Sequence, residues 1–136
     1  MRVAALAANG WLRCVPAILV MGFIFLLSHQ PGDSISLPDI VNLDKVLHCL
    51  IYTALGLAAL FALSPPWRQQ HPLKAGIAVV VFCLLYGVTD EFHQSFIPGR
   101  MPSLADVAAD GLGGLLAVAG WNGQASWHRL AIQRRV

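Results

Sequence analysis

The sequence predicts an all-α membrane protein with four transmembrane helices and both termini in the cytoplasm. Three observations support this fold class. First, 57% of the 136 residues are hydrophobic and only 12% are charged, with a mean hydropathy of +0.64, whereas soluble domains average about 25% charged residues. Second, the apolar residues fall in four long runs. Third, acidic and basic residues gather at opposite ends of those runs. We therefore expect one membrane domain covering 1–136.

The first two runs predict helices near 11–29 and 44–63. Arg13 lies within a turn of the end of the first run, so its side chain can snorkel to the membrane interface. No signal-peptide cleavage site follows this run, and we expect the helix to be retained. Ser64-Pro65-Pro66 ends the second run, and a short basic loop comes next.

The other two runs predict helices near 74–96 and 103–121. The apolar part of the third run is shorter than the roughly 20 residues that a bilayer core requires. We therefore expect this helix to continue through Asp90 and Glu91, which places two carboxylates near the membrane boundary. The fourth run carries small residues at every fourth position, a pattern that lets helices pack closely in lipid; they are Ala105, Ala109, Gly113 and Ala117. The polar, basic tail after residue 121 could hold a short interfacial helix.

The distribution of charges predicts the orientation. Seven of the nine basic residues lie in the N-terminal segment, the loop after the second helix, or the tail; they are Arg2, Arg13, Arg68, Lys74, Arg129, Arg134 and Arg135. Because cytoplasmic segments of membrane proteins are enriched in Lys and Arg, these regions should be cytoplasmic. The other two loops hold only Lys45 and Arg100 and should face outward. All seven acidic residues lie in or beside the outward stretches; they are Asp33, Asp39, Asp44, Asp90, Glu91, Asp106 and Asp110.

Three helices are expected to bring polar residues together at the outward end. Residues four apart share a helix face, as Asp44 and His48 do on the second helix and Asp90 and Gln94 on the third. Ionisable groups in a membrane cost roughly 2.5–3.5 kcal/mol each and usually face the interior of a helix bundle. We therefore predict an outward-facing ligand site made of Asp44, Lys45, His48, Tyr52, Asp90, Glu91, Gln94, Arg100, Ser103, Asp106 and Asp110.

Purely structural interpretations remain open for several of these residues. Asp44 could be the N-cap of the second helix, and Ser103 could form a capping box with Asp106. Lys45 and Arg100 could neutralise neighbouring carboxylates in a salt-bridge cluster that only fixes helix packing. Asp106 and Asp110 resemble half of a membrane phosphotransferase motif, but the rest of that motif is missing. We assign no cofactor and no metal site.

The motif segments occur in a recognisable order. They are Asp44-Lys45-Val46-Leu47-His48, Asp90-Glu91-Phe92-His93-Gln94, Pro98-Gly99-Arg100 and Ser103-Leu104-Ala105-Asp106. Over about 28–114 the chain resembles the VanZ-like family of small polytopic membrane proteins, in which many members carry Asn at the place of Asp110. The founding member is linked to teicoplanin resistance in glycopeptide-resistant bacteria. The resemblance implies a multi-pass protein of the bacterial plasma membrane and supports the motif residues as a unit.

The leading functional hypothesis is a cell-envelope protein that recognises a lipid-linked or anionic headgroup ligand at the outer leaflet. Arg100, Lys45 and His48 would meet the anionic group, while the carboxylates would orient these cations or hold a metal. One alternative is a membrane-embedded hydrolase or transferase, with His48, Glu91 and Asp90 as catalytic candidates. Another is a structural or accessory subunit. The expected partner is a membrane lipid or a lipid-linked cell-wall intermediate, not a nucleic acid; the oligomeric state is left open.

Overall fold

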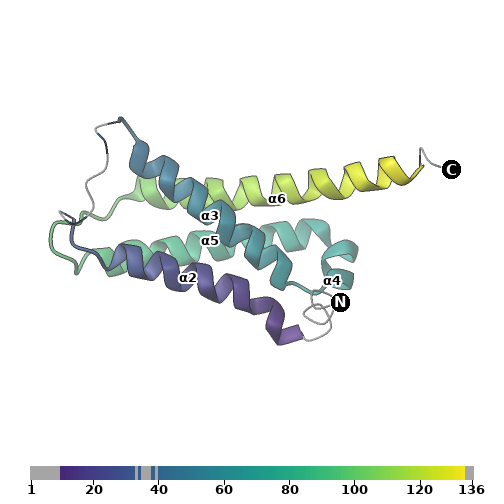
Figure 1. Ribbon diagram of the computed structural model, residues 1–136, viewed down its shortest axis with the longest axis horizontal. Helices are drawn as coiled ribbons and strands as arrows, with labels where there is room; N and C mark the ends of the chain where they lie inside the picture. Colours follow the sequence, from purple (N-terminus) through teal and green to yellow (C-terminus); the bar gives the residue numbers. More distant parts are fainter. Residues whose placement is uncertain (1–9, 33, 35–37, 39, 134–136) are drawn as a thin grey trace.

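The computed structural model describes residues 10–32, 34, 38 and 40–133. Every regular element in this part is helical (Figure 1). A short 3₁₀ helix, η1 (Gly10–Cys14), leads into α2 (Val15–Ser28), α3 (Leu43–Ala62), α4 (Pro65–Gln70), α5 (Pro72–Gln94) and α6 (Leu104–Gln133). Four stretches are long and apolar enough to cross a membrane: Gly10–Ser28, Leu43–Ala62, Pro72–Gln94 and Leu104–Gly123. The predicted all-α fold with four candidate transmembrane helices is confirmed. The orientation of the termini stays a prediction, and the arginines at 2, 134 and 135 lie outside the described residues.

The predicted helix boundaries agree with the structure within two residues except in two places. The basic loop after the second helix contains α4, which begins with two prolines. Proline is well suited to the first turn of a helix because the missing N–H would have no partner there, so Pro65 and Pro66 end one helix and start another. The fourth helix continues past residue 121 to Gln133. No proline interrupts the sequence after Trp121, so the tail extends α6 directly.

The central contacts of the bundle join α6 to α3 and α5 through glycines. A Cβ atom at Gly113 would lie 2.5 Å from the backbone oxygen of Cys49 on α3. A Cβ atom at Gly114 would lie 3.1 Å from Cβ of Cys83 on α5. Only the second half of the predicted small-residue row is buried, whereas Ala105 is exposed. A row at every fourth position drifts by about 40° per step around an α-helix, so its members cannot all face one neighbour.

Two arginines hold the end of α3 that lies next to α4. Arg13 is 4% exposed and donates hydrogen bonds from Nη2 to the carbonyl oxygens of Phe61 and Leu63. Arg68 donates from Nη1 to Leu60 O at 2.7 Å and stacks over the Trp121 ring. Both satisfy carbonyl groups that have no partner within the helix. Arg13 is therefore a buried cap and does not snorkel as predicted.

The opposite end of the bundle is more open. Figure 1 shows α3 inclined to α2, so that the two helices meet near α4 and diverge toward the start of α3. The last turns of α2 and α5 and the first turns of α3 and α6 all lie at this end, which we call the motif end. The predicted convergence of motif residues from separate helices is therefore present in the fold.

Candidate functional site

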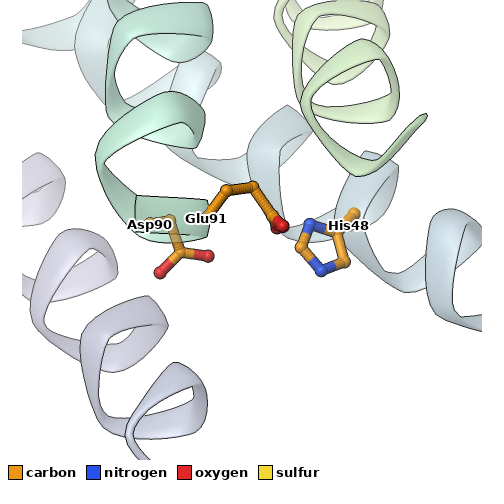
Figure 2. A group of neighbouring side chains, drawn as sticks. All are labelled: His48, Asp90 and Glu91. Carbon is orange, nitrogen blue, oxygen red and sulfur yellow. The ribbon is translucent and has the colours of Figure 1, made fainter. Parts of the chain in front are cut away.

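The motif end gathers ionisable side chains from three helices. His48 comes from α3, and Asp90 and Glu91 are neighbours on α5 (Figure 2). Each of these residues offers one N or O atom within 4.8 Å of the atoms offered by the other two. Asp90 and Glu91 are each 6% exposed. The sequence predicted that α5 would continue through both carboxylates, and the helix indeed ends only at Gln94.

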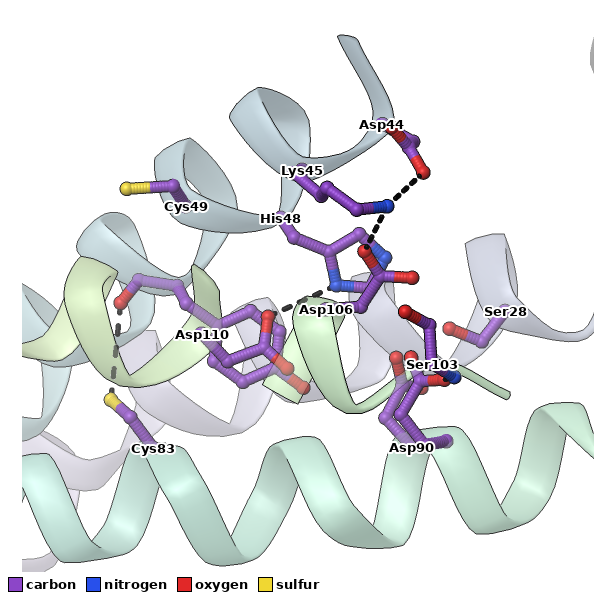
Figure 3. A network of polar contacts seen from close by, with 12 residues as sticks. Ser28, Asp44, Lys45, His48, Cys49, Cys83, Asp90, Ser103, Asp106 and Asp110 are labelled. Carbon is purple, nitrogen blue, oxygen red and sulfur yellow. Dashed lines mark hydrogen bonds and ion pairs between the residues drawn. The ribbon is translucent and has the colours of Figure 1, made fainter. Parts of the chain in front are cut away.

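Two side-chain pairs join α3 to α6 (Figure 3). Lys45 Nζ lies 2.7 Å from Asp44 Oδ2 and 3.1 Å from Asp106 Oδ1. His48 Nδ1 lies 3.0 Å from Asp110 Oδ1. Asp44 is not the helix N-cap that the sequence allowed, because Asn42 occupies that position with a left-handed φ of 61°. It lies in the first turn of α3, where a carboxylate interacts favourably with the helix dipole.

Glu91 fixes the start of α6. Its Oε2 accepts a hydrogen bond from the backbone N–H of Ser103 at 2.6 Å. In a capping box this N–H would be bound by the side chain of the third helical residue, here Asp106. Asp106 is paired with Lys45, and a carboxylate from another helix takes its place. The capping box that the sequence allowed is therefore replaced by a contact between α5 and α6.

Asp90 and Gln94 face α2. Gln94 Nε2 donates to Asp90 Oδ2 at 3.1 Å and to Ser28 Oγ at 3.4 Å. Ser28 is the last residue of α2 and is 5% exposed. Ser28 is not among the site residues predicted from the sequence. Its small hydroxyl side chain at the end of an apolar helix was the signal that could have identified it.

Three polar atoms of the cluster are buried with neither a hydrogen-bond partner nor an ion-pair partner among the described residues: Tyr52 OH, Glu91 Oε1 and Asp110 Oδ2. Tyr52 and Asp110 are both 0% exposed. Buried polar groups are normally paired, and each unpaired group costs about 1–3 kcal/mol. The motif end therefore contains buried hydrogen-bonding atoms that the described residues leave unsatisfied.

Arg100 binds backbone carbonyls and not the carboxylates. Its Nε donates to Gln30 O and its Nη2 donates to Leu27 O, both at 3.1 Å. The backbone N–H of Gly32 donates to Pro98 O at 3.0 Å beside it. Arg100 thus clasps the loop between α5 and α6 onto the end of α2. Of the two cations that could have neutralised carboxylates, only Lys45 contacts them in the described structure.

A comparison with known protein families identifies the family of this chain. The model of the VanZ/LLP1 family matches residues 14–124. The chain belongs to the VanZ/LLP1 family. The match is longer than the 28–114 region that carried the resemblance, and it includes every residue of the motif end. No curated protein and no solved structure matches the chain.

The VanZ/LLP1 motif end opens into a cleft of about 490 Å³ between α2 and α3. Apolar side chains of both helices form most of its walls, including Phe23, Leu27 and Leu47. His48, Asp90, Gln94 and Arg100 also line it. The sequence did not predict this cleft, because α2 is apolar on all sides and its composition does not show which face meets α3.

Proposed function

We propose that this VanZ/LLP1 protein binds a membrane lipid with a polar, phosphate-bearing headgroup, such as a lipid-linked cell-wall intermediate, in the cleft between α2 and α3. The observation that carries the proposal is the composition of the cleft. Its walls are apolar, and His48, Asp90 and Arg100 lie along its lining. Ligand pockets of about 300–1,000 Å³ commonly combine apolar walls with a few polar groups.

The position of the cleft fits a ligand that enters from the membrane. Both walls belong to stretches that are long and apolar enough to cross a bilayer, Gly10–Ser28 and Leu43–Ala62. Leu47 and Leu50 line the cleft and are 42% and 61% exposed, so its mouth lies on the apolar outside of the bundle. A lipid chain could occupy this region while its headgroup reaches the motif end.

The outward orientation of the motif end belongs to the same proposal. Among the described residues outside the motif end, Arg13, Arg68 and Lys74 all belong to segments at the α4 end. The positive-inside rule favours a cytoplasmic location for that end. The lipid would then be bound at the outer leaflet of the bacterial plasma membrane.

Purification with retained lipid tests the proposal. The variant Leu47→Trp places a large side chain in the cleft wall. Leu85→Trp is the matched control, because Leu85 on α5 is 62% exposed and is not part of the cleft lining. Mass spectrometry of lipids that remain after detergent exchange should find a phosphate-bearing lipid on wild type and Leu85→Trp, and a depleted signal on Leu47→Trp. Equal lipid profiles for the two tryptophan variants would refute the cleft as the binding site.

A hydrolase or transferase acting on such a lipid is the second candidate, and one observation favours it. A carboxylate that holds Nδ1 of a histidine can orient the ring as a general base, and Asp110 holds His48 in this way. The assay is incubation of purified protein with polyprenyl-phosphate and phospholipid substrates, followed by product analysis. Turnover that falls by about 10²-fold or more in His48→Ala, with lipid retention unchanged, would favour the enzyme. Binding without any product would favour the binder.

Teicoplanin resistance is the activity that the family resemblance suggests. If the bound lipid is a cell-wall intermediate, expression of the protein should raise the teicoplanin concentration needed to stop growth of a sensitive host. Leu47→Trp should lose this effect and Leu85→Trp should keep it. Protection that is equal for both variants would separate resistance from the cleft.

A further inference from the structure

We propose that His48, Asp90 and Glu91 bind one divalent transition-metal ion, Zn²⁺ or Mn²⁺, at the motif end. The three residues offer one nitrogen and two carboxylate oxygens within 4.8 Å of one another. Figure 2 shows the Glu91 side chain extended from α5 toward the imidazole of His48 on α3. An ion placed between them would join two helices that are far apart in the sequence.

The unpartnered oxygen of Glu91 points to a ligand independently of this clustering. Oε2 is used by the N–H of Ser103, whereas Oε1 is buried without a partner among the described residues. Glu91 is only 6% exposed, so bulk water does not solvate this oxygen. A bound cation would satisfy it and remove the cost of leaving it unpaired.

The balance of charge favours a cation at the same place. Lys45 contacts Asp44 and Asp106. Among the described residues, no Lys or Arg forms an ion pair with Asp90, Glu91 or Asp110: Asp110 is paired with His48, and Arg100 donates to backbone carbonyls. Buried carboxylates are costly unless they are paired, protonated or bound to a metal. A divalent ion would compensate this excess of acidic groups.

The contact between His48 and Asp110 prepares the histidine for a metal. Metal-bound histidines commonly donate their second ring N–H to a carboxylate, which fixes the ring and its tautomer. Asp110 Oδ1 lies 3.0 Å from Nδ1 and can accept that hydrogen, which leaves the Nε2 lone pair for the ion. Asp110 would thus be a positioning residue behind the metal ligand.

The donor set indicates the kind of metal. One imidazole and two carboxylates suit Zn²⁺ or Mn²⁺ better than Ca²⁺ or Mg²⁺, which prefer oxygen ligands alone. His48 and Asp90 line the cleft, so positions not filled by protein could face a bound molecule. The proposal of a cation site depends on these residues alone. A further role for the ion, in which it would bridge the carboxylates to a phosphate group that they would otherwise repel, rests on the proposed function.

Metal binding to the purified full-length chain tests the site. The protein is prepared in detergent without a histidine tag, stripped with chelator and dialysed against Zn²⁺ or Mn²⁺, and the bound metal is counted by mass spectrometry. We expect one ion per chain for wild type. His48→Ala and Glu91→Gln should each weaken binding by at least tenfold. X-ray absorption of the Zn²⁺ form should show one imidazole among oxygen ligands.

Two other histidines at the motif end, His29 and His93, provide the control. His29 Nδ1 and His93 Nε2 lie 3.3 Å apart on the exposed side of the bundle and could attract Zn²⁺. The double variant with His29→Ala and His93→Ala should keep the ion. Loss of the ion in this variant with retention in His48→Ala would overturn the proposal. The proposal would also be overturned if folded wild type bound neither metal stoichiometrically, which would indicate that protonation keeps the carboxyl groups neutral.

The variant Leu47→Trp distinguishes failure of the lipid proposal from failure of the metal site, because it should lose the lipid but keep the metal.

Discussion

His48 on α3 and Asp110 on α6 are 62 positions apart in the sequence, and Nδ1 of the histidine lies 3.0 Å from Oδ1 of the aspartate. The side chain of Asp110 is 0% exposed, whereas that of His48 is 21% exposed and lines the cleft. The aspartate is therefore the inner member that orients the ring, and the histidine is the member that a ligand can reach. The pair connects the packing of the bundle to the proposed binding site.

The first prediction separates hydrogen bonding from charge at position 110. Asp110→Asn keeps an oxygen that can accept the Nδ1 hydrogen, so the free energy of unfolding should change by less than about 1 kcal/mol. Asp110→Leu leaves His48 without its acceptor and should cost about 1–3 kcal/mol. Thermal unfolding in detergent measures both changes. If Asn is as harmful as Leu, the charge of Asp110 and not its hydrogen bond supports the fold.

The second prediction concerns the space that Gly87 leaves for Asp110. A Cβ atom at position 87 would lie 2.4 Å from Asp110 Oδ2. Gly87→Ala should therefore push the carboxylate away from His48 and lower stability by about 1–3 kcal/mol. Gly22→Ala is the control, because a Cβ atom there meets nothing within 4 Å. Thermal unfolding should distinguish the two variants clearly, and equal melting temperatures would contradict the close packing of α5 on α6.

Much of this arrangement could be predicted from helical spacing. Asp44 and His48, Asp90 and Gln94, and Asp106 and Asp110 are each four residues apart near a helix end, so they had to lie at one end of a bundle. Which groups pair depends on the rotation of each helix about its axis, and sequence spacing does not determine that rotation.

The role of Arg100 could not be predicted for a similar reason. The turn at Gly99, with a φ of 74°, directs the chain so that the guanidinium reaches the carbonyl oxygens of Leu27, in α2, and Gln30, just after it. Backbone carbonyls are present at every helix end, so the sequence carries no sign of this contact. The cleft was missed because it depends on the inclination of α3 to α2.

The third prediction is the orientation of the chain. Single cysteines at Ser34 and Gln69 report on the two ends of the bundle, in a background where Cys14, Cys49 and Cys83 are replaced by alanine. An impermeant thiol reagent added to intact cells should label position 34 and spare position 69. Labelling of both positions after the cells are opened is the control for accessibility. The reverse pattern in intact cells would place the motif end in the cytoplasm.

The fourth prediction tests the clasp formed by Arg100. Arg100→Lys keeps the charge but cannot reproduce the two-pronged geometry that reaches Gln30 O and Leu27 O. Arg100→Lys should lose about 1 kcal/mol of stability, and Arg100→Ala about 1–2 kcal/mol, since each hydrogen bond contributes about 1 kcal/mol. Thermal unfolding in detergent measures both. If Arg100→Lys keeps the stability of wild type but loses retained lipid, Arg100 acts on the ligand and not as a clasp.

The fifth prediction asks whether the polar cluster serves a ligand or only packing. Glu91→Gln retains an oxygen that can accept the Ser103 N–H, so the contact between α5 and α6 can persist. Residues selected for function often reduce stability, and replacing them can leave the fold unchanged or more stable. We therefore expect Glu91→Gln to accumulate in the membrane and to unfold within about 1 kcal/mol of wild type, while metal binding weakens by at least tenfold.

The control for the fifth prediction is Glu91→Leu, which removes both oxygens and leaves the Ser103 N–H unpaired. Glu91→Leu should lose about 1–3 kcal/mol of stability as well as the ligand. Two results together would favour the accessory-subunit hypothesis. Glu91→Gln would be as unstable as Glu91→Leu, and both variants would bind as much metal and lipid as wild type. Glu91 would then serve only to link α5 to α6, and its carboxylate charge would not take part in binding a ligand.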